Sequence, residues 1–133
     1  YCRAKAHIKE QQYGLAVVDL TPISKEVRTV IGAEAKYELA NCYFLLGAID
    51  MAEQEVMSFM QMQTTQQYWL AKSMILLADI NLQRNDSFQA KQYLLALQAN
   101  YKQTDDIQSI VAEKLRALEE KEETPEIEEE ETL

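Results

Sequence analysis

Alanines recur in pairs at a nearly constant spacing along this chain of 133 residues. Within each pair the second alanine follows the first by 12 residues, and the pairs recur at intervals of 36 and then 38 residues. Internal periods of this length are typical of folds that repeat one small structural unit. The spacing therefore predicts a unit of two closely packed helices, repeated along the chain. The three pairs are Ala4 and Ala16, Ala40 and Ala52, and Ala78 and Ala90.

Large apolar residues follow the second alanine of every pair at the same two positions, four and seven residues later. Positions with this spacing share one face of a helix, so we expect them to form the core beside the close alanine contacts. The chain also has only three glycines and two prolines, which favours long helices over a strand-rich fold. The apolar pairs are Leu20 and Ile23, Val56 and Phe59, and Leu94 and Leu97.

The second unit carries the clearest motif, which consists of Lys36, Leu39, Ala40, Tyr43, Gly47, Ala52 and Val56. This pattern resembles the tetratricopeptide repeat, whose signature is W-x2-L-G-x2-Y, then A-x3-F, then P. Lysine stands in place of the signature tryptophan, alanine in place of the helical glycine, and the closing proline is missing. In the first and third units His7 and Asn81 replace the tyrosine, while Gln11 and Asn85 replace the turn glycine. The resemblance covers roughly the first 100 residues.

The resemblance implies an all-α fold, a right-handed α-solenoid of three helix hairpins followed by a C-terminal capping helix. We expect the hairpins in residues 1–103, the capping helix in 104–120 and a disordered acidic tail in 121–133. Pro22 predicts that the second helix ends or kinks just before it, because proline lacks the backbone N–H that a helix needs. The expected helices of the hairpins are 1–10, 13–21, 33–46, 49–62, 66–83 and 87–99.

Capping signals support the ends of this arrangement. Thr64 and Gln67 have capping-box spacing at the start of the fifth helix, and Asp105 offers a cap to the last one. One apolar stripe at helical spacing follows that cap, so we expect the last helix to cover the third hairpin. The stripe consists of Ile107, Ile110, Val111, Leu115 and Leu118.

The segments 68–72 (YWLAK) and 75–79 (ILLAD) are similar to multi-repeat bacterial proteins of the same superfamily. The chain does not begin with methionine, and its first helix starts closer to its alanine than the second unit's does. We therefore expect a C-terminal piece of a longer bacterial protein. Its compartment stays open between the periplasm or cell envelope and, as the alternative, the cytoplasm.

The net charge of −9 is concentrated at the C-terminus. Residues 119–133 hold nine glutamates and one lysine, a net of −8, which leaves −1 for residues 1–118. A nearly neutral body has no basic stripe for phosphates, so nucleic acid is excluded as a partner. No run of 18 apolar residues is present, which excludes direct membrane insertion. The glutamates could serve solvation, bind a basic partner or contact lysines of the chain's own groove.

Residues for catalysis or metal binding are scarce. His7 is the only histidine, and no second metal ligand lies at helical spacing from it. Glycine-rich phosphate loops, nucleophile elbows and paired-cysteine motifs are absent from the sequence. We therefore expect no enzymatic activity, no cofactor and no metal, with His7 in a structural role.

A second stripe on the first helix of each unit lies three residues before, one after and four after its alanine. In the tetratricopeptide family this face lines the concave side of the superhelix, where segments of partner proteins bind. The resemblance thus implies a partner-binding face made of Tyr1, Lys5, Ile8, Tyr37, Asn41, Phe44, Lys72, Ile75, Asp79 and Leu82.

This face predicts a noncatalytic scaffold or adaptor that binds a protein or peptide. The alternative is a purely structural C-terminal cap of a longer repeat protein whose binding surface lies upstream. Burial of Tyr37 and Phe44 would favour the structural cap over the adaptor. For Phe44 and Leu82, simple packing against the neighbouring second helices is an equal alternative to partner binding. The family's clamp for acidic carboxyl-terminal peptides matches poorly, because Leu76 stands where that clamp has arginine. The oligomeric state stays open.

Overall fold

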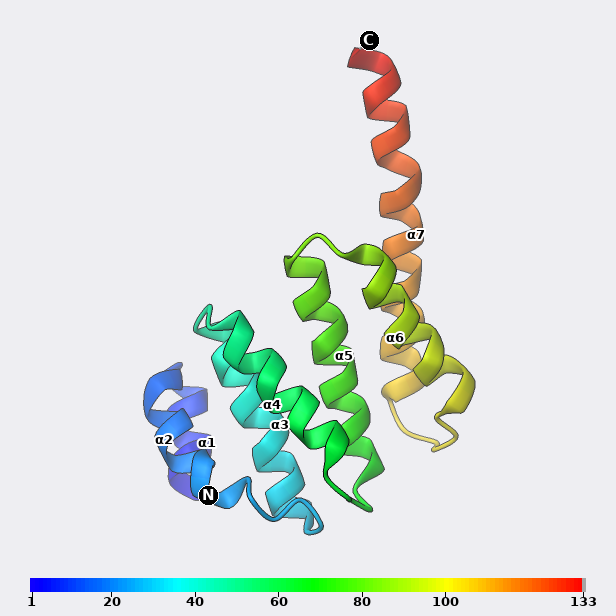
Figure 1. The fold of residues 1–133 in the computed structure, drawn as a ribbon. Helices are drawn as coiled ribbons and strands as arrows, with labels where there is room; N and C mark the ends of the chain where they lie inside the picture. The colour runs from blue at the N-terminus through cyan, green and yellow to red at the C-terminus, as the bar shows by residue number, and fades with distance from the viewer. Residues whose placement is uncertain (133) are drawn as a thin grey trace.

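The computed structural model describes the backbone of residues 1–132 and the side chains of residues 1–121. This part of the chain is all-α and contains no strand, as the sequence predicts. Each helix packs against the next one along the chain, so the helices follow one another across the molecule in chain order (Figure 1). The helices are α1 (Cys2–Lys9), α2 (Tyr13–Ile23), α3 (Val30–Leu45), α4 (Ile49–Gln61), α5 (Gln67–Gln83), α6 (Ser87–Asn100) and α7 (Ile107–Thr132).

Direct contacts also join α3 to α5 and α5 to α7. These odd-numbered helices therefore lie side by side, and the even-numbered helices α4 and α6 each pack against the two helices that flank them in the chain. Of these, α3 and α5, like α1, carry the stripe that the sequence assigns to partner binding.

The turns after α1, α3 and α5 share one backbone geometry. Gln11, Gly47 and Asn85 all have positive φ, at 62°, 83° and 62°. In each turn the N–H of the following residue donates to a carbonyl five residues earlier, a bond that satisfies a helix C-terminus. The turns therefore repeat with the same periods as the alanines. The three bonds are Gln12 to His7 (2.7 Å), Ala48 to Tyr43 (2.9 Å) and Asp86 to Asn81 (2.8 Å).

All six repeated alanines are buried, and each pair lies in one apolar cluster. The residue before the first alanine of units two and three, Leu39 and Leu77, packs on the second helix of the preceding unit. Leu115 lies 38 residues after Leu77 and packs on α6 in the same way. The apolar stripe of α7, with Leu118 also buried, thus covers the α5–α6 pair as expected.

The prediction that the second helix ends before Pro22 is wrong, because α2 continues through Pro22 to Ile23, while the alternative of a kink stays a prediction. Proline removes only the bond to the carbonyl of Val18, whose side chain is exposed, so water can satisfy that carbonyl. The bond two positions further along remains, since the N–H of Ser24 donates to the carbonyl of Leu20 at 2.9 Å. A proline in the last turn is therefore tolerated.

Helix α3 begins three residues before the expected position, at Val30. The Thr29 hydroxyl caps it by accepting the N–H of Gly32 at 3.0 Å, and donates to the carbonyl of Glu26 at 3.0 Å. Gly32 packs directly on that loop, since a Cβ at this position would lie 1.7 Å from the Glu26 oxygen. The glycine is thus required by a close backbone approach.

The predicted capping box at α5 does not form as expected. Thr64 lies before the actual N-cap, Gln66, and its hydroxyl donates to the carbonyl of Val27 at 2.6 Å, so it ties two loops together. The cap at α7 does form, because a carboxylate oxygen of Asp105 accepts the N–H of Ile107 at 3.0 Å.

Helix α7 extends to Thr132 instead of ending near residue 120. Glutamate and lysine have high helix propensity, which favours continuation of the helix. The side chains of residues 122–133 lie outside those that the structure describes, so the prediction for the tail at 121–133 stays a prediction.

Candidate partner-binding face

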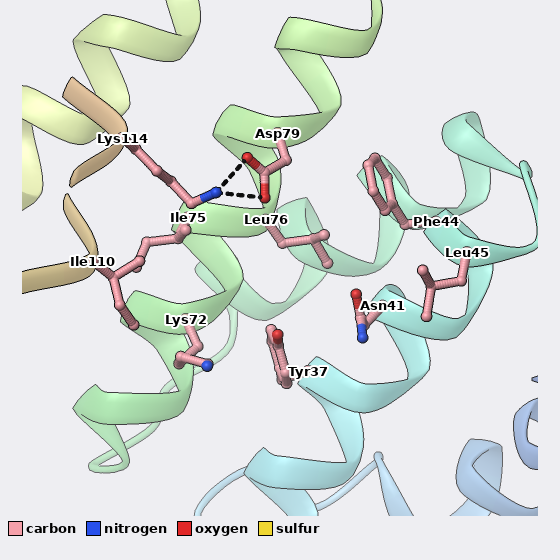
Figure 2. A pocket seen from close by; sticks show the side chains of 10 residues that line it. All are labelled: Tyr37, Asn41, Phe44, Leu45, Lys72, Ile75, Leu76, Asp79, Ile110 and Lys114. Carbon is pink, nitrogen blue, oxygen red and sulfur yellow. Dashed lines mark hydrogen bonds and ion pairs between the residues drawn. The ribbon is translucent and has the colours of Figure 1, made fainter. Parts of the chain in front are cut away.

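A hollow of about 240 Å³ opens between α3, α5 and α7 (Figure 2). We call it the central hollow. Six of the predicted partner-binding residues line it, namely Tyr37, Asn41, Phe44, Lys72, Ile75 and Asp79. The other lining residues are Leu45, Leu76, Ile110 and Lys114.

The aromatic wall of the central hollow is built around Tyr37. Its ring is half-buried, and its centroid lies 5.7 Å from that of Trp69. The ammonium of Lys72 lies over the Tyr37 ring, 5.5 Å from its centroid. Burial raises the pKa of Tyr37 to about 12, so its hydroxyl keeps its proton at physiological pH. Tyr37 can therefore offer both an apolar ring and a hydrogen-bond donor.

The two lysines of the central hollow differ in their partners. Lys114 donates to both carboxylate oxygens of Asp79, at 2.9 and 3.3 Å, so these charges compensate each other. Lys72 forms no ion pair with any side chain of residues 1–121. Within the same part of the chain, the side-chain amide of Asn41 makes no hydrogen bond. Together with the Tyr37 hydroxyl, Lys72 and Asn41 are thus the polar groups of the hollow that remain available to a partner.

A second hollow, of about 280 Å³, lies between α1 and α3. We call it the first-unit hollow. It contains the predicted residues Tyr1, Lys5 and Ile8 together with Lys9, Glu34 and Glu38. The Lys5 ammonium lies 3.9 Å from Glu34 and 4.9 Å from the centroid of the Tyr1 ring.

Glu38 is electrostatically linked to both hollows. Burial and the neighbouring charge of Glu34 raise its pKa, while Lys72 in one hollow and Lys5 in the other oppose that shift. The pKa of Glu38 therefore depends on the charges present in both hollows.

Leu82 is the one predicted residue that lines neither hollow. It packs against the core cluster formed by α5, α6 and α7, so the packing alternative applies to it. Phe44 is half-buried and lines the central hollow while touching the core beside Ala40.

Sequence reasoning missed the contribution of α7 to the site, because it treated that helix only as a cover. Ile110 and Lys114 follow Lys72 and Leu76 by 38 residues, the same interval that relates α5 to α3. Continuing the period by one more step would have located both residues. The acidic pair Glu34 and Glu38 was also missed, since the stripe was read at three offsets only.

His7 has a structural partner. Its Nδ1 lies 2.7 Å from Asp19 of α2, and the Arg3 side chain donates to the same carboxylate at 2.9 Å. Burial would raise the pKa of Asp19, but the hydrogen bonds from His7 and Arg3 outweigh it and lower the pKa. The hydrogen-bonded cluster of Arg3, His7 and Asp19 thus joins α1 to α2.

Residues 1–121 contain no group of three side chains that could hold a metal ion.

Comparisons with known protein families, with curated proteins and with solved structures find no match for this chain. None of the helices within the described residues combines the length and apolar character that crossing a membrane requires.

Proposed function

We propose that this chain is a noncatalytic scaffold or adaptor of the tetratricopeptide-repeat type that binds a segment of a protein partner. In this proposal the helices form a right-handed α-solenoid of three hairpins capped by α7, as part of a longer bacterial protein. The binding surface is the central hollow together with the first-unit hollow.

The single observation that carries the proposal is the composition of the central hollow. It places half-buried apolar walls from Tyr37 and Phe44 beside two polar groups. The ammonium of Lys72 lies over the Tyr37 ring but forms no ion pair with a described side chain, and the amide of Asn41 makes no hydrogen bond with one. Apolar anchors surrounded by a few free polar groups are typical of protein recognition sites. Its volume of about 240 Å³ is below the roughly 300–1,000 Å³ of small-molecule pockets, which favours one side chain of a partner as the occupant.

The charges set the chemistry of that partner. Lys114 is paired with Asp79, whereas Lys72 forms no ion pair and has only the more distant charge of Glu38 nearby, so Lys72 is the cation open to a further counter-charge. The preferred ligand is therefore an extended segment with a large apolar side chain next to an acidic residue. The apolar group would fill the hollow against Phe44 and Ile75, and the carboxylate would lie beside Lys72.

The test is selection from a phage-displayed library of random linear peptides on the immobilised chain. Enriched peptides should share an apolar residue adjacent to an acidic one, and both Phe44→Ala and Lys72→Ala should abolish their binding. Phe88→Ala is the matched control, because Phe88 is an equally large aromatic residue that is 71% exposed and lies outside both hollows. Binding should survive that change.

A purely structural role, with the working surface elsewhere in a longer protein, is the second candidate. It is favoured by the packing of α7 over the α5–α6 pair, which a cap requires. Selection that enriches no peptide, or peptides whose binding ignores Phe44→Ala, would replace the adaptor proposal with this one.

A further inference from the structure

The central hollow lies along two junctions between neighbouring helices, α3–α5 and α5–α7, and these junctions differ in charge. The 38-residue period makes Asn41 of α3 equivalent to Asp79 of α5. The same period makes Leu76 of α5 equivalent to Lys114 of α7, and all four side chains line the hollow. The α3–α5 junction therefore supplies an amide and a leucine, whereas the equivalent α5–α7 junction supplies a carboxylate and an ammonium.

The charged junction is an ion pair that a ligand in the hollow can reach. The Lys114 ammonium donates to both carboxylate oxygens of Asp79, at 2.9 and 3.3 Å (Figure 2). The two side chains are 32% and 30% exposed, so neither charge is shut away from the hollow. Asp79 thus engages a lysine that would otherwise be open to an acidic ligand.

The position of this pair relative to Lys72 fixes which part of a ligand reaches it. Lys72 and Asp79 lie seven residues apart on α5, with Ile75 between them (Figure 2). Seven residues of helix rise about 10 Å, which is the length of about three residues of extended chain. An extended segment that runs along α5 with one carboxylate beside Lys72 therefore brings the residue two or three positions further on to the ion pair. A second carboxylate there would face Asp79, and like charges opposed across an interface weaken binding.

We propose that Asp79 determines the specificity of the central hollow by keeping Lys114 paired, so that the hollow binds segments with one acidic residue and rejects those with a second acidic residue two or three positions away. This selectivity rests on the proposed function, in which the central hollow binds an apolar residue next to an acidic one. Lys114 is the cation that a second carboxylate would need, and Asp79 both engages that cation and repels the carboxylate. Binding sites commonly gain specificity through such a repulsive element as well as through attraction.

The test repeats the peptide selection on the chain carrying Asp79→Asn, which keeps the shape of the side chain and removes its charge. Peptides enriched on this variant should carry two acidic residues, two or three positions apart, whereas those from the unmodified chain should carry one. The best peptide from the unmodified chain is then given a second glutamate at that spacing. By isothermal titration calorimetry, this addition should tighten binding to Asp79→Asn at least about fivefold and should not tighten binding to the unmodified chain.

Two further variants separate the effect of the ion pair from that of net charge. Asp50→Asn is the matched control, because Asp50 also pairs with a basic side chain, Arg84, but lies on α4 and does not line the central hollow. It removes the same charge from the chain and should leave the preference for one acidic residue unchanged. The double change Asp79→Asn/Lys114→Gln also removes the freed ammonium, so the gain from the second glutamate should disappear.

The outcomes distinguish this proposal from the adaptor function. If the second glutamate does not tighten binding to Asp79→Asn, or tightens binding to the unmodified chain equally, the role of Asp79 is overturned while the adaptor function stands. A gain that Asp50→Asn or the double variant also shows overturns that role too, because net charge or a group other than Lys114 would then be its source. A selection that enriches no peptide on any of these chains overturns both proposals.

Discussion

Replacing each of the three glycines with alanine should give three different effects on stability, because the glycines serve different purposes. At Gly32 a new Cβ would lie 1.7 Å from the Glu26 carbonyl, so backbone must move by more than an ångström. Overpacking of this kind costs about 1–3 kcal/mol. The movement also weakens the hydrogen bond that the Thr29 hydroxyl donates to the Glu26 carbonyl, which adds about 1 kcal/mol.

The expected loss for Gly32→Ala is therefore roughly 2–4 kcal/mol. At roughly 2.1 cal/mol/K of unfolding entropy per residue, each kcal/mol shifts the melting temperature of a chain of this length by about 3–4 °C. Circular dichroism at rising temperature should thus show a midpoint lower by about 7–15 °C.

The other two glycines are internal controls. Gly14 lies in α2 with nothing within 4 Å of a new Cβ, so Gly14→Ala should stabilise the chain by about 0.5–1 kcal/mol. Gly47 has the same free space but a φ of +83°, so Gly47→Ala should cost about 1–2 kcal/mol through backbone strain alone. A Gly32→Ala variant as stable as Gly14→Ala would refute the close approach between α3 and the preceding loop.

Three further predictions concern buried contacts. The ammonium of Lys36 is buried and lies 2.6 Å from the Glu55 carboxylate. Glu55→Gln removes this counter-charge, so it should lower the free energy of unfolding in urea by roughly 3 kcal/mol. The double change Lys36→Met/Glu55→Leu leaves no unpaired charge and should be nearly neutral. Ala40 and Leu115 are both buried. Ala40→Leu should destabilise the chain by about 1–3 kcal/mol through overpacking, and Leu115→Ala should destabilise it by about 2–5 kcal/mol by leaving a cavity. Melting temperatures equal to that of the unmodified chain would contradict the packing described above. Glu38→Gln should stabilise the chain at neutral pH, because the raised pKa means that the folded state resists ionisation of Glu38. The contribution of Glu38 to stability should fall as pH rises from 4.5, the ordinary pKa of glutamate, through its raised pKa in the folded chain. The advantage of Glu38→Gln should therefore vanish below pH 4.5. A stability gain that persists there would argue against this cause.

The sequence was sufficient to predict the helices where periodicity and turn position agree. The turn residues Gln11 and Asn85 were identified only as replacements for Gly47, and all three adopt positive φ. Repetition thus located the three turns, although the positive φ of Gln11 and Asn85 was not itself predicted, because residues other than glycine rarely adopt it. Six of the ten predicted face residues line one hollow, and five of them, all but Lys72, share the offsets from the alanine that fix the helix face.

Two features were missed because they depend on contacts between segments of the chain that no periodic pattern relates to each other. Thr64 has capping-box spacing to Gln67, yet its hydroxyl bonds to Val27, which lies 37 residues away. The requirement for Gly32 likewise comes from a loop whose path the sequence does not specify. Lys114 differs from these, because the 38-residue period relates it to Leu76; it was missed because α7 was treated only as a cover.

Packing of each helix on its successor has a consequence for how the molecule loses structure. Contacts between α1 and α7 are absent among the substantial helix contacts of the described chain, so neither end stabilises the other directly. Unfolding can therefore proceed inward from either end, one helix pair at a time, with free energies that rise toward the middle. Helices α3 and α5, which each contact three or four others, should exchange their amide hydrogens most slowly. The walls of the central hollow that they supply would then stay ordered while the ends open.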